Sequence, residues 1–240
     1  MSEFNQSNIY ERDETSGLKA YITRVFTIMG GGLALTGFVA WQGYKSLMLG
    51  RGFIANLFYG FPQISWILLI AEFGIVIGLS AGLRKMSTGL ATALFLAYAL
   101  ITGLTFSYIP FLYGIHTVFT AFVYAAVLFV SCAIIGHTTS VDLSRFSGLM
   151  IGGLVSMVVV GILSIFIPIL RNNILFGYIG LILFLFLTAW DMQKIKGFYY
   201  GVEEGRLKNN LAIYGAFELY LDFLNMFLYL LRILGRGSKK

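Results

Sequence analysis

Four acidic residues stand inside or beside long apolar stretches of this sequence, and their chemistry needs an explanation. They are Glu72, Asp191, Glu218 and Asp222. An acid at the centre of a membrane helix costs roughly 2.5–3.5 kcal/mol on insertion scales, so each is expected to face protein or water rather than lipid. An ionisable group in such a place is a candidate functional residue.

The stretch from Asn209 to Gly235 carries two of these acids on one helical stripe. Its other residues are nearly all Leu, Phe, Ile, Met, Ala or Tyr. It is long enough to cross a bilayer, which takes ~20 residues. Because the stripe cannot face lipid, we expect this helix inside a bundle. In steps of four and three, the stripe comprises Glu218, Asp222, Asn225, Tyr229 and Arg232.

Asp191 lies near the end of the apolar stretch before this helix, and a short loop joins the two. Helices joined in this way pack antiparallel, so Asp191 and Asp222 can approach each other. Two carboxylates in low dielectric cannot both ionise cheaply, and such a pair shares a proton and titrates as a unit. Without the proton it attracts a hard cation to its oxygens, which predicts a pH-sensitive cation gate. The larger oxygen cage of a tight cation site is not visible.

The competing interpretation of these acids is structural. Lys194, Arg84 or Arg232 would neutralise them, and the ion pairs would lock the helices together. Glu72 lies near the middle of its stretch, three turns before Arg84, and should face the bundle interior or a cavity or carry a proton. Its role is open. The candidate partners of the gate are Arg84, Glu218, Asn225 and Glu72.

Catalysis is not expected. The sequence lacks a His-Glu-x-x-His motif and a phosphate loop, and its single Cys132 excludes a Cys pair. His116 and His137 flank one stretch at opposite ends, too far apart for a joint metal site. The Tyr-Asp and Gly-x-Gly-Asp signatures of intramembrane aspartyl proteases are absent, since Leu221 precedes Asp222. We expect no enzyme and no required cofactor.

Composition places the chain in a membrane. It is 58% hydrophobic and 12% charged, with mean hydropathy +0.82, whereas soluble domains carry about 25% charged residues. We expect an all-α bundle of seven transmembrane helices in which the semi-polar seventh is central and the first six surround it. The longest connection, residues 44–62, is rich in Gly and aromatic residues and should include an interfacial piece. The seven stretches are residues 21–43, 63–83, 88–109, 115–136, 146–167, 173–195 and 209–235.

Residues 1–20 are predicted to form a polar cytoplasmic tail, 21–235 a single transmembrane domain and 236–240 a short basic tail. The N-terminus lacks the charged-then-apolar layout of a signal peptide. With this end inside, Lys and Arg number ten inside against three outside, the three being Lys45, Arg51 and Arg171. The four C-terminal basic residues would join the inside only if the last helix re-entered. Its length favours crossing, which we expect.

The segment Glu-Leu-Tyr-Leu-Asp-Phe-Leu-Asn-Met-Phe at residues 218–227 resembles the signature of the Bax inhibitor family, also called the transmembrane Bax inhibitor motif family. Trp-Asp-Met-Gln-Lys-Ile at residues 190–195 is similar to that family's aspartate segment closing helix 6. The resemblance covers essentially the whole chain. It implies a seven-helix fold and a pH-sensing dyad of Asp191 and Asp222 near the cytoplasmic side, with a basic partner for which Arg84 is the nearest match. It also implies Ca²⁺ leakage, with weak or transient Ca²⁺ binding at the dyad.

The resemblance therefore favours a pH-sensitive calcium leak channel in a bacterial inner membrane. Since bacterial members are linked to control of a membrane protease and eukaryotic members to suppression of cell death, a non-transporting regulator is the alternative. A proton-coupled cation exchanger is a third hypothesis. The expected partners are membrane lipids, Ca²⁺, protons and a membrane protease or other membrane protein. Nucleic acid is not expected, because the basic residues are scattered at helix ends, and we expect a monomer.

Overall fold

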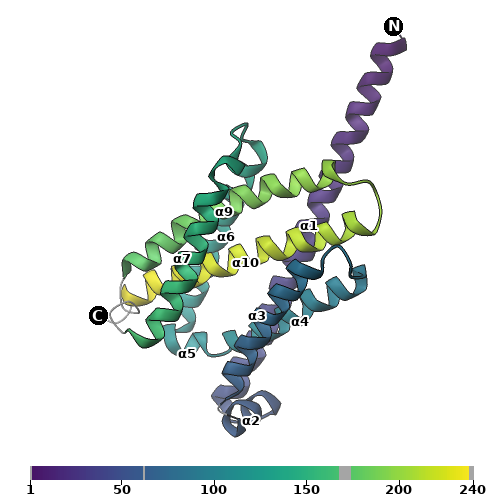
Figure 1. The fold of residues 1–240 in the computed structure, drawn as a ribbon. Helices are drawn as coiled ribbons and strands as arrows, with labels where there is room; N and C mark the ends of the chain where they lie inside the picture. Colours follow the sequence, from purple (N-terminus) through teal and green to yellow (C-terminus); the bar gives the residue numbers. More distant parts are fainter. Residues whose placement is uncertain (1, 62, 168–173, 238–240) are drawn as a thin grey trace. The chain divides into compact units, whose positions relative to one another are not determined.

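The computed structural model describes residues 2–61, 63–167 and 174–237, which are helical nearly throughout and contain no strand (Figure 1). Arg171, Lys239 and Lys240 of the charge count, and Pro62, lie outside the described residues. The helices are α1 (Ser2–Leu49), α2 (Phe53–Gly60), α3 (Ile64–Gly82), α4 (Thr88–Phe106), α5 (Ile109–Tyr113), α6 (Ile115–Thr138), the 3₁₀ turn η1 (Leu143–Phe146), α7 (Ser147–Phe166), α9 (Ile174–Gly201) and α10 (Arg206–Gly237).

Seven of these helices are long and apolar enough to cross a membrane, as the sequence predicted. They coincide with the seven apolar stretches, and α2 forms in the connection where an interfacial piece was expected. Residues 2–20, predicted as a polar tail, continue α1 without a break. The last helix is also unbroken over 32 residues. At 1.5 Å per residue it is about 48 Å long, which favours crossing over re-entry.

The chain groups into two compact units, Met1–Phe106 with Lys194–Phe217, and Ser107–Gln193 with Glu218–Lys240. We call them unit 1 and unit 2. Helices α9 and α10 each contribute one part to unit 1 and the other to unit 2. The sequence predicted one domain for residues 21–235, and that stays a prediction.

In unit 1, α1 and α4 run parallel and touch closely. Gly32 of α1 leaves room for the ring of Phe95. One turn on, the buried hydroxyl of Thr36 donates to the carbonyl of Ala99 at 2.9 Å. A Cβ on Gly103 would meet Val39 at 2.6 Å. These successive pairs advance in the same direction on both helices, and small residues allow the approach.

In unit 2, α6 and α7 pack against α9 and α10. Helix α7 runs antiparallel to α9, since Gly153 faces Leu183 while Met157 faces Gly180. Helix α6 buries Ala121, Ala125, Phe129, Ala133 and Gly136, a stripe at helical spacing.

The seventh spanning helix supplies much of the core, as predicted. The most apolar window of its span, Arg206–Gly235, is 67% buried, against 11–39% for the other six spans. Fully buried side chains along α10 include Phe217 in unit 1 and Tyr220 and Met226 in unit 2. A helix covered on nearly every side can hold polar groups that a lipid-facing helix cannot.

Candidate functional site

Asp191 of α9 and Asp222 of α10 are both buried in unit 2, with 6% and 4% of their surface exposed. Among the Asp and Glu residues whose burial the structure describes, no other is buried to this degree. Charged groups are almost never fully buried unless they are paired. These two positions are therefore the strongest candidates for a polar site inside the bundle.

Both aspartates lie on the faces through which α9 and α10 touch, and we call this interface the α9–α10 seam. Its contacts in unit 2 include the rings of Phe184 and Tyr229, 5.8 Å apart, and the packing of Tyr229 onto Gly180. Asp191 follows Phe184 by seven residues, and Asp222 precedes Tyr229 by seven. Seven residues are close to two helical turns, so each aspartate shares the face of its seam residue.

The register of the seam places Asp191 and Asp222 near the same level. Gly177 faces Ile233 and Gly180 faces Tyr229, so each step forward on α9 corresponds to a step back on α10. Continued along the antiparallel pair, this register puts Asp191 level with Glu218. Asp222 lies one turn further along, an axial offset of about 6 Å.

Residues close to the aspartates in the chain are tightly packed against α6. Phe223, next to Asp222, packs edge-on against Phe122 and Phe129 of α6 at centroid distances of 5.4 and 5.7 Å. Beside Asp191, α6 approaches α9 so closely that a Cβ on Gly136 would overlap the carbonyl oxygen of Ala189. Low local dielectric strengthens the interaction of any charge or proton with this pair.

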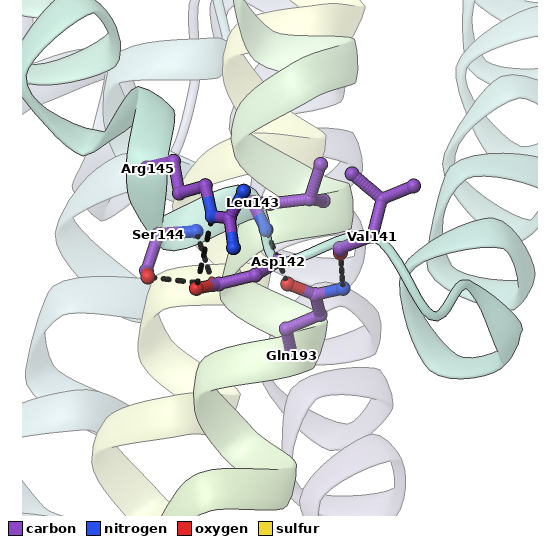
Figure 2. A network of polar contacts seen from close by, with 6 residues as sticks. All are labelled: Val141, Asp142, Leu143, Ser144, Arg145 and Gln193. Carbon is purple, nitrogen blue, oxygen red and sulfur yellow. Dashed lines mark hydrogen bonds and ion pairs between the residues drawn. The ribbon is translucent and has the colours of Figure 1, made fainter.

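A polar network ties the turn between α6 and α7 to α9, two residues beyond Asp191. Figure 2 shows Gln193 reaching both sides of this turn. Its Nε2 donates to the carbonyl of Val141 at 2.7 Å, and its Oε1 accepts from the amide of Leu143 at 3.0 Å. The side chain of Gln193 thereby replaces backbone bonds that the turn cannot make internally.

Asp142 caps the same turn. Its Oδ1 accepts from the amide of Ser144 at 3.0 Å and from the hydroxyl of Ser144 at 2.6 Å, while Oδ2 lies 3.8 Å from Nε of Arg145 (Figure 2). The hydrogen bonds from Ser144, and secondarily the charge of Arg145, lower the pKa of Asp142 below its ordinary value. Asp142 is exposed, so it serves the turn rather than the buried site.

The sequence profile of the family described as "Inhibitor of apoptosis-promoting Bax1" matches residues 18–239 of this chain. The chain belongs to the Bax inhibitor family. It is 36% identical to inner membrane protein YbhL of Escherichia coli K12 over 92% of this chain and 93% of the relative. It is 32% identical to an uncharacterized membrane protein of Streptococcus pyogenes serotype M3, over 98% of this chain and 100% of the relative. An uncharacterized protein of Borreliella burgdorferi is 30% identical over 94% of this chain and 96% of the relative.

The other predicted site residues of this Bax inhibitor family member are distributed over both units. Glu218 is half-buried on the acidic stripe of unit 2. Asn225, also in unit 2, donates to the carbonyl of Leu221 on its own helix at 2.8 Å. Glu72 and Arg84 belong to unit 1. Glu72 accepts from the hydroxyl of Thr105 on α4 at 3.3 Å, and Arg84 is exposed beyond the end of α3.

The described residues of this family member contain no group of three or more His, Cys, Asp or Glu that could hold a metal ion. The two carboxylates of Asp191 and Asp222 can bind a cation transiently. A tight Ca²⁺ site needs roughly six to eight oxygen ligands.

Residues 78–82 have the spacing Gly-x-Ser-x-Gly that many hydrolases carry around a nucleophilic serine. Here they form the last residues of helix α3, whereas in hydrolases the motif lies on a strand-to-helix turn that exposes the serine.

Sequence reasoning missed an anchor at the start of α10. Asn210 in unit 1 is fully buried, and its amide donates to the carbonyls of Leu83 and Met86, at 3.0 Å each. Its Oδ1 accepts from the hydroxyl of Thr88 at 2.8 Å. The amide thus joins the first turns of α10 to both sides of the α3–α4 turn. A single polar residue at the edge of an apolar stretch carries no sequence signal for such a role.

A second missed feature is Lys208, which is buried in unit 1. Its Nζ lies 2.7 Å from the carboxylate of Glu204 and 3.9 Å from the ring centroid of Tyr199. An opposite charge and an aromatic face together compensate a buried ammonium group. From the sequence, Lys208 was used only as one of the basic residues that predict which loops face the cytoplasm.

Proposed function

We propose that this protein is a pH-sensitive calcium leak channel in which Asp191 and Asp222 form the gating pair. The observation that supports the proposal is the burial of these two acids on the facing sides of the α9–α10 seam. Two buried carboxylates on facing helices are more stable with a shared proton or a bound cation than with both charges uncompensated.

The chemistry of the pair gives the gate its pH dependence. With one shared proton the pair carries a single negative charge and can hold the two helices together. After the proton leaves, the two carboxylates repel each other and offer their oxygens to a hard cation such as Ca²⁺. Proton and Ca²⁺ therefore compete for the same atoms. Ca²⁺ is the permeant ion here rather than a resident cofactor.

A cytoplasmic N-terminus is part of the proposal. The excess of Lys and Arg in the segments assigned to the inside supports it. In that orientation the α9–α10 turn faces the cytoplasm, and the pair lies on the cytoplasmic half of the bundle. The pH that the gate senses is then the cytoplasmic pH.

The test is Ca²⁺ flux into proteoliposomes between about pH 5 and 8, a window in which the shifted acids of such pairs titrate. The unmodified protein is compared with Asp191→Asn, Asp222→Asn and Glu203→Gln. Glu203 is an exposed acid in the α9–α10 turn and serves as the matched control. We expect a flux that varies with pH in the unmodified protein and in the control, and that loses this variation in both Asn variants.

Two other outcomes select the competing functions. Absence of flux above that of empty liposomes at every pH would support a non-transporting regulator, the role that the description of the matching family suggests. Uphill Ca²⁺ movement driven by an imposed proton gradient would support an exchanger. Unchanged pH dependence in both Asn variants would remove the aspartates from the gate and leave them as helix locks.

A further inference from the structure

We propose that the junction of α1 and α2 is an interfacial anchor that binds anionic phospholipid headgroups through Lys45 and Arg51. We call residues 41–61 the α1–α2 corner. The inference is independent of the proposed leak, since the corner belongs to unit 1 and contains none of the gate residues.

The corner is held in a fixed geometry by two side chains. Ser46 of α1 donates to the carbonyl of Arg51 at 2.7 Å and accepts from the amide of Ala55 at 3.0 Å. It satisfies an amide in the first turn of α2, as an N-cap side chain would. Tyr59 of α2 donates to the carbonyl of Leu47 near the end of α1 at 3.0 Å.

The backbone of the corner requires glycine. Gly50 has φ +60° and Gly52 has φ +96°, conformations that L side chains rarely adopt. Between these glycines stands the exposed Arg51, whose carbonyl accepts the hydrogen bond from Ser46. The turn therefore presents a basic residue whose backbone is tied to α1.

That surface is aromatic and lies between two membrane spans. The spans end at Leu49 and resume at Ile64. Helix α2 has eight residues, far fewer than the ~20 needed to cross. Ala55 and Phe58 are buried against the rest of unit 1, while Phe53 is 80% exposed and Tyr59 and Phe61 are each 62% exposed. Exposed Trp and Tyr rings at the end of a span are typical of the membrane interface, and the corner offers Trp41 and Tyr59.

The charge of the corner selects the kind of lipid. Lys45 and Arg51 are exposed, and the sequence has no acid between Glu14 and Glu72. The ammonium group of Lys45 lies 4.9 Å from the ring centroid of Trp41, which holds it beside the aromatic surface. Two exposed cations beside an aromatic surface, in a stretch of sequence without acids, complement an anionic headgroup.

The test uses Trp41 and Trp66, both exposed and both at this end of unit 1, as fluorescent reporters. The third tryptophan is removed in every sample by Trp190→Phe. The full chain is reconstituted in vesicles of phosphatidylcholine with either brominated phosphatidylglycerol or brominated phosphatidylcholine as the quencher. Bromines near the glycerol end of the acyl chains are compared with bromines near the methyl end.

We expect brominated phosphatidylglycerol to quench roughly twofold or more strongly than brominated phosphatidylcholine, with the bromines near the glycerol end more effective. The double variant K45Q/R51Q should lose the preference for phosphatidylglycerol. The control K85Q/R206Q removes the same charge from exposed positions at the other end of unit 1 and should keep it. High salt should weaken the preference in the unmodified protein, a measurement that needs no variant.

Equal quenching by the two lipids in the unmodified protein would overturn the headgroup site. So would a preference that survives K45Q/R51Q or is insensitive to salt. Stronger quenching by the bromines near the methyl end would overturn the interfacial position of the corner.

Discussion

The backbone of Gly136 in α6 lies directly against the carbonyl group of Ala189 in α9. No side chain fits between them, so glycine at position 136 sets the spacing of two helices beside Asp191. We expect Gly136→Ala to destabilise the protein by about 1–3 kcal/mol, because the added methyl group must push one backbone away from the other. Thermal unfolding in detergent measures this. Gly152→Ala on α7, where a Cβ meets nothing within 4 Å, is the control, and an equal loss in both would contradict the packing argument.

Replacement of Asn210 should loosen the start of α10. Asn210→Ala removes two donated hydrogen bonds and leaves the carbonyls of Leu83 and Met86 buried without this partner. The expected cost is about 2–4 kcal/mol, since each lost bond to a buried group costs on the order of 1–2 kcal/mol. Asn225→Ala, which removes only a bond within its own helix, should cost much less. Equal losses of thermal stability in the two variants would show that Asn210 is no special anchor.

Gln193→Ala should release the α6–α7 turn while leaving α9 helical. The amide of Leu143 and the carbonyl of Val141 lose their partner, so hydrogen exchange should rise across residues 139–146. Replacement by Glu keeps the acceptor for Leu143 and removes the donor to Val141, and should give an intermediate result. Gln42→Ala, an exposed change on α1, should leave exchange in the turn unaltered. Protection that persists in Gln193→Ala would assign the order of the turn to its internal hydrogen bonds, those accepted by Thr139 and Asp142.

Asp142 should not contribute to a pH response near neutrality. Because its pKa is lowered in the folded protein, its stabilising effect is present above the ordinary pKa and is lost only as the pH falls through the lowered value. Between about pH 5 and 8 the group stays ionised. Asp142→Asn is therefore expected to leave the pH midpoint of Ca²⁺ flux unchanged. A shifted midpoint would mean that the turn, and not only the buried pair, senses protons.

Competition between Ca²⁺ and protons gives a further prediction for the buried pair. If both bind the oxygens of Asp191 and Asp222, a higher Ca²⁺ concentration should move the pH midpoint of flux to lower pH. A tenfold increase should shift it by at most about one pH unit. Flux measurements at several external Ca²⁺ concentrations test this, with Mg²⁺ as the comparison ion. A pH midpoint of flux that does not change with Ca²⁺ concentration would mean that Ca²⁺ and protons do not bind the same atoms.

The sequence predicted the helices well because their signal is simple. Uninterrupted apolar stretches bounded by polar residues locate the spans to within a few residues, except where polar residues 2–20 extend α1. The stripe of Glu218, Asp222 and Asn225 also indicated correctly that α10 must be covered. The cost of an acid in lipid makes that inference strong, whatever the details of packing.

The finer features could not be read from the sequence, since they depend on which side chains meet across helices. Asn210 and Gln193 look like ordinary polar residues near helix ends, and only the folded chain brings them to the carbonyls of Leu83 and Val141. The burial of Lys208 is equally invisible, because its compensation by Glu204 and Tyr199 arises from the α9–α10 turn. Helix rotation also fixes the facing of Asp191 and Asp222, which the sequence left open.

The polarity of α10 has a consequence for how the protein is made. Its mean hydropathy of 1.3 is the lowest of the seven spans, which otherwise range from 1.5 to 2.5. It follows the other six spans in the sequence, so it is synthesised after them. Its acids can then pass from the translocation channel to protein neighbours without resting in lipid. The order of the spans along the chain thus lets the least hydrophobic helix insert beside helices that are already made. A variant in which this helix is moved to the start of the chain should insert poorly.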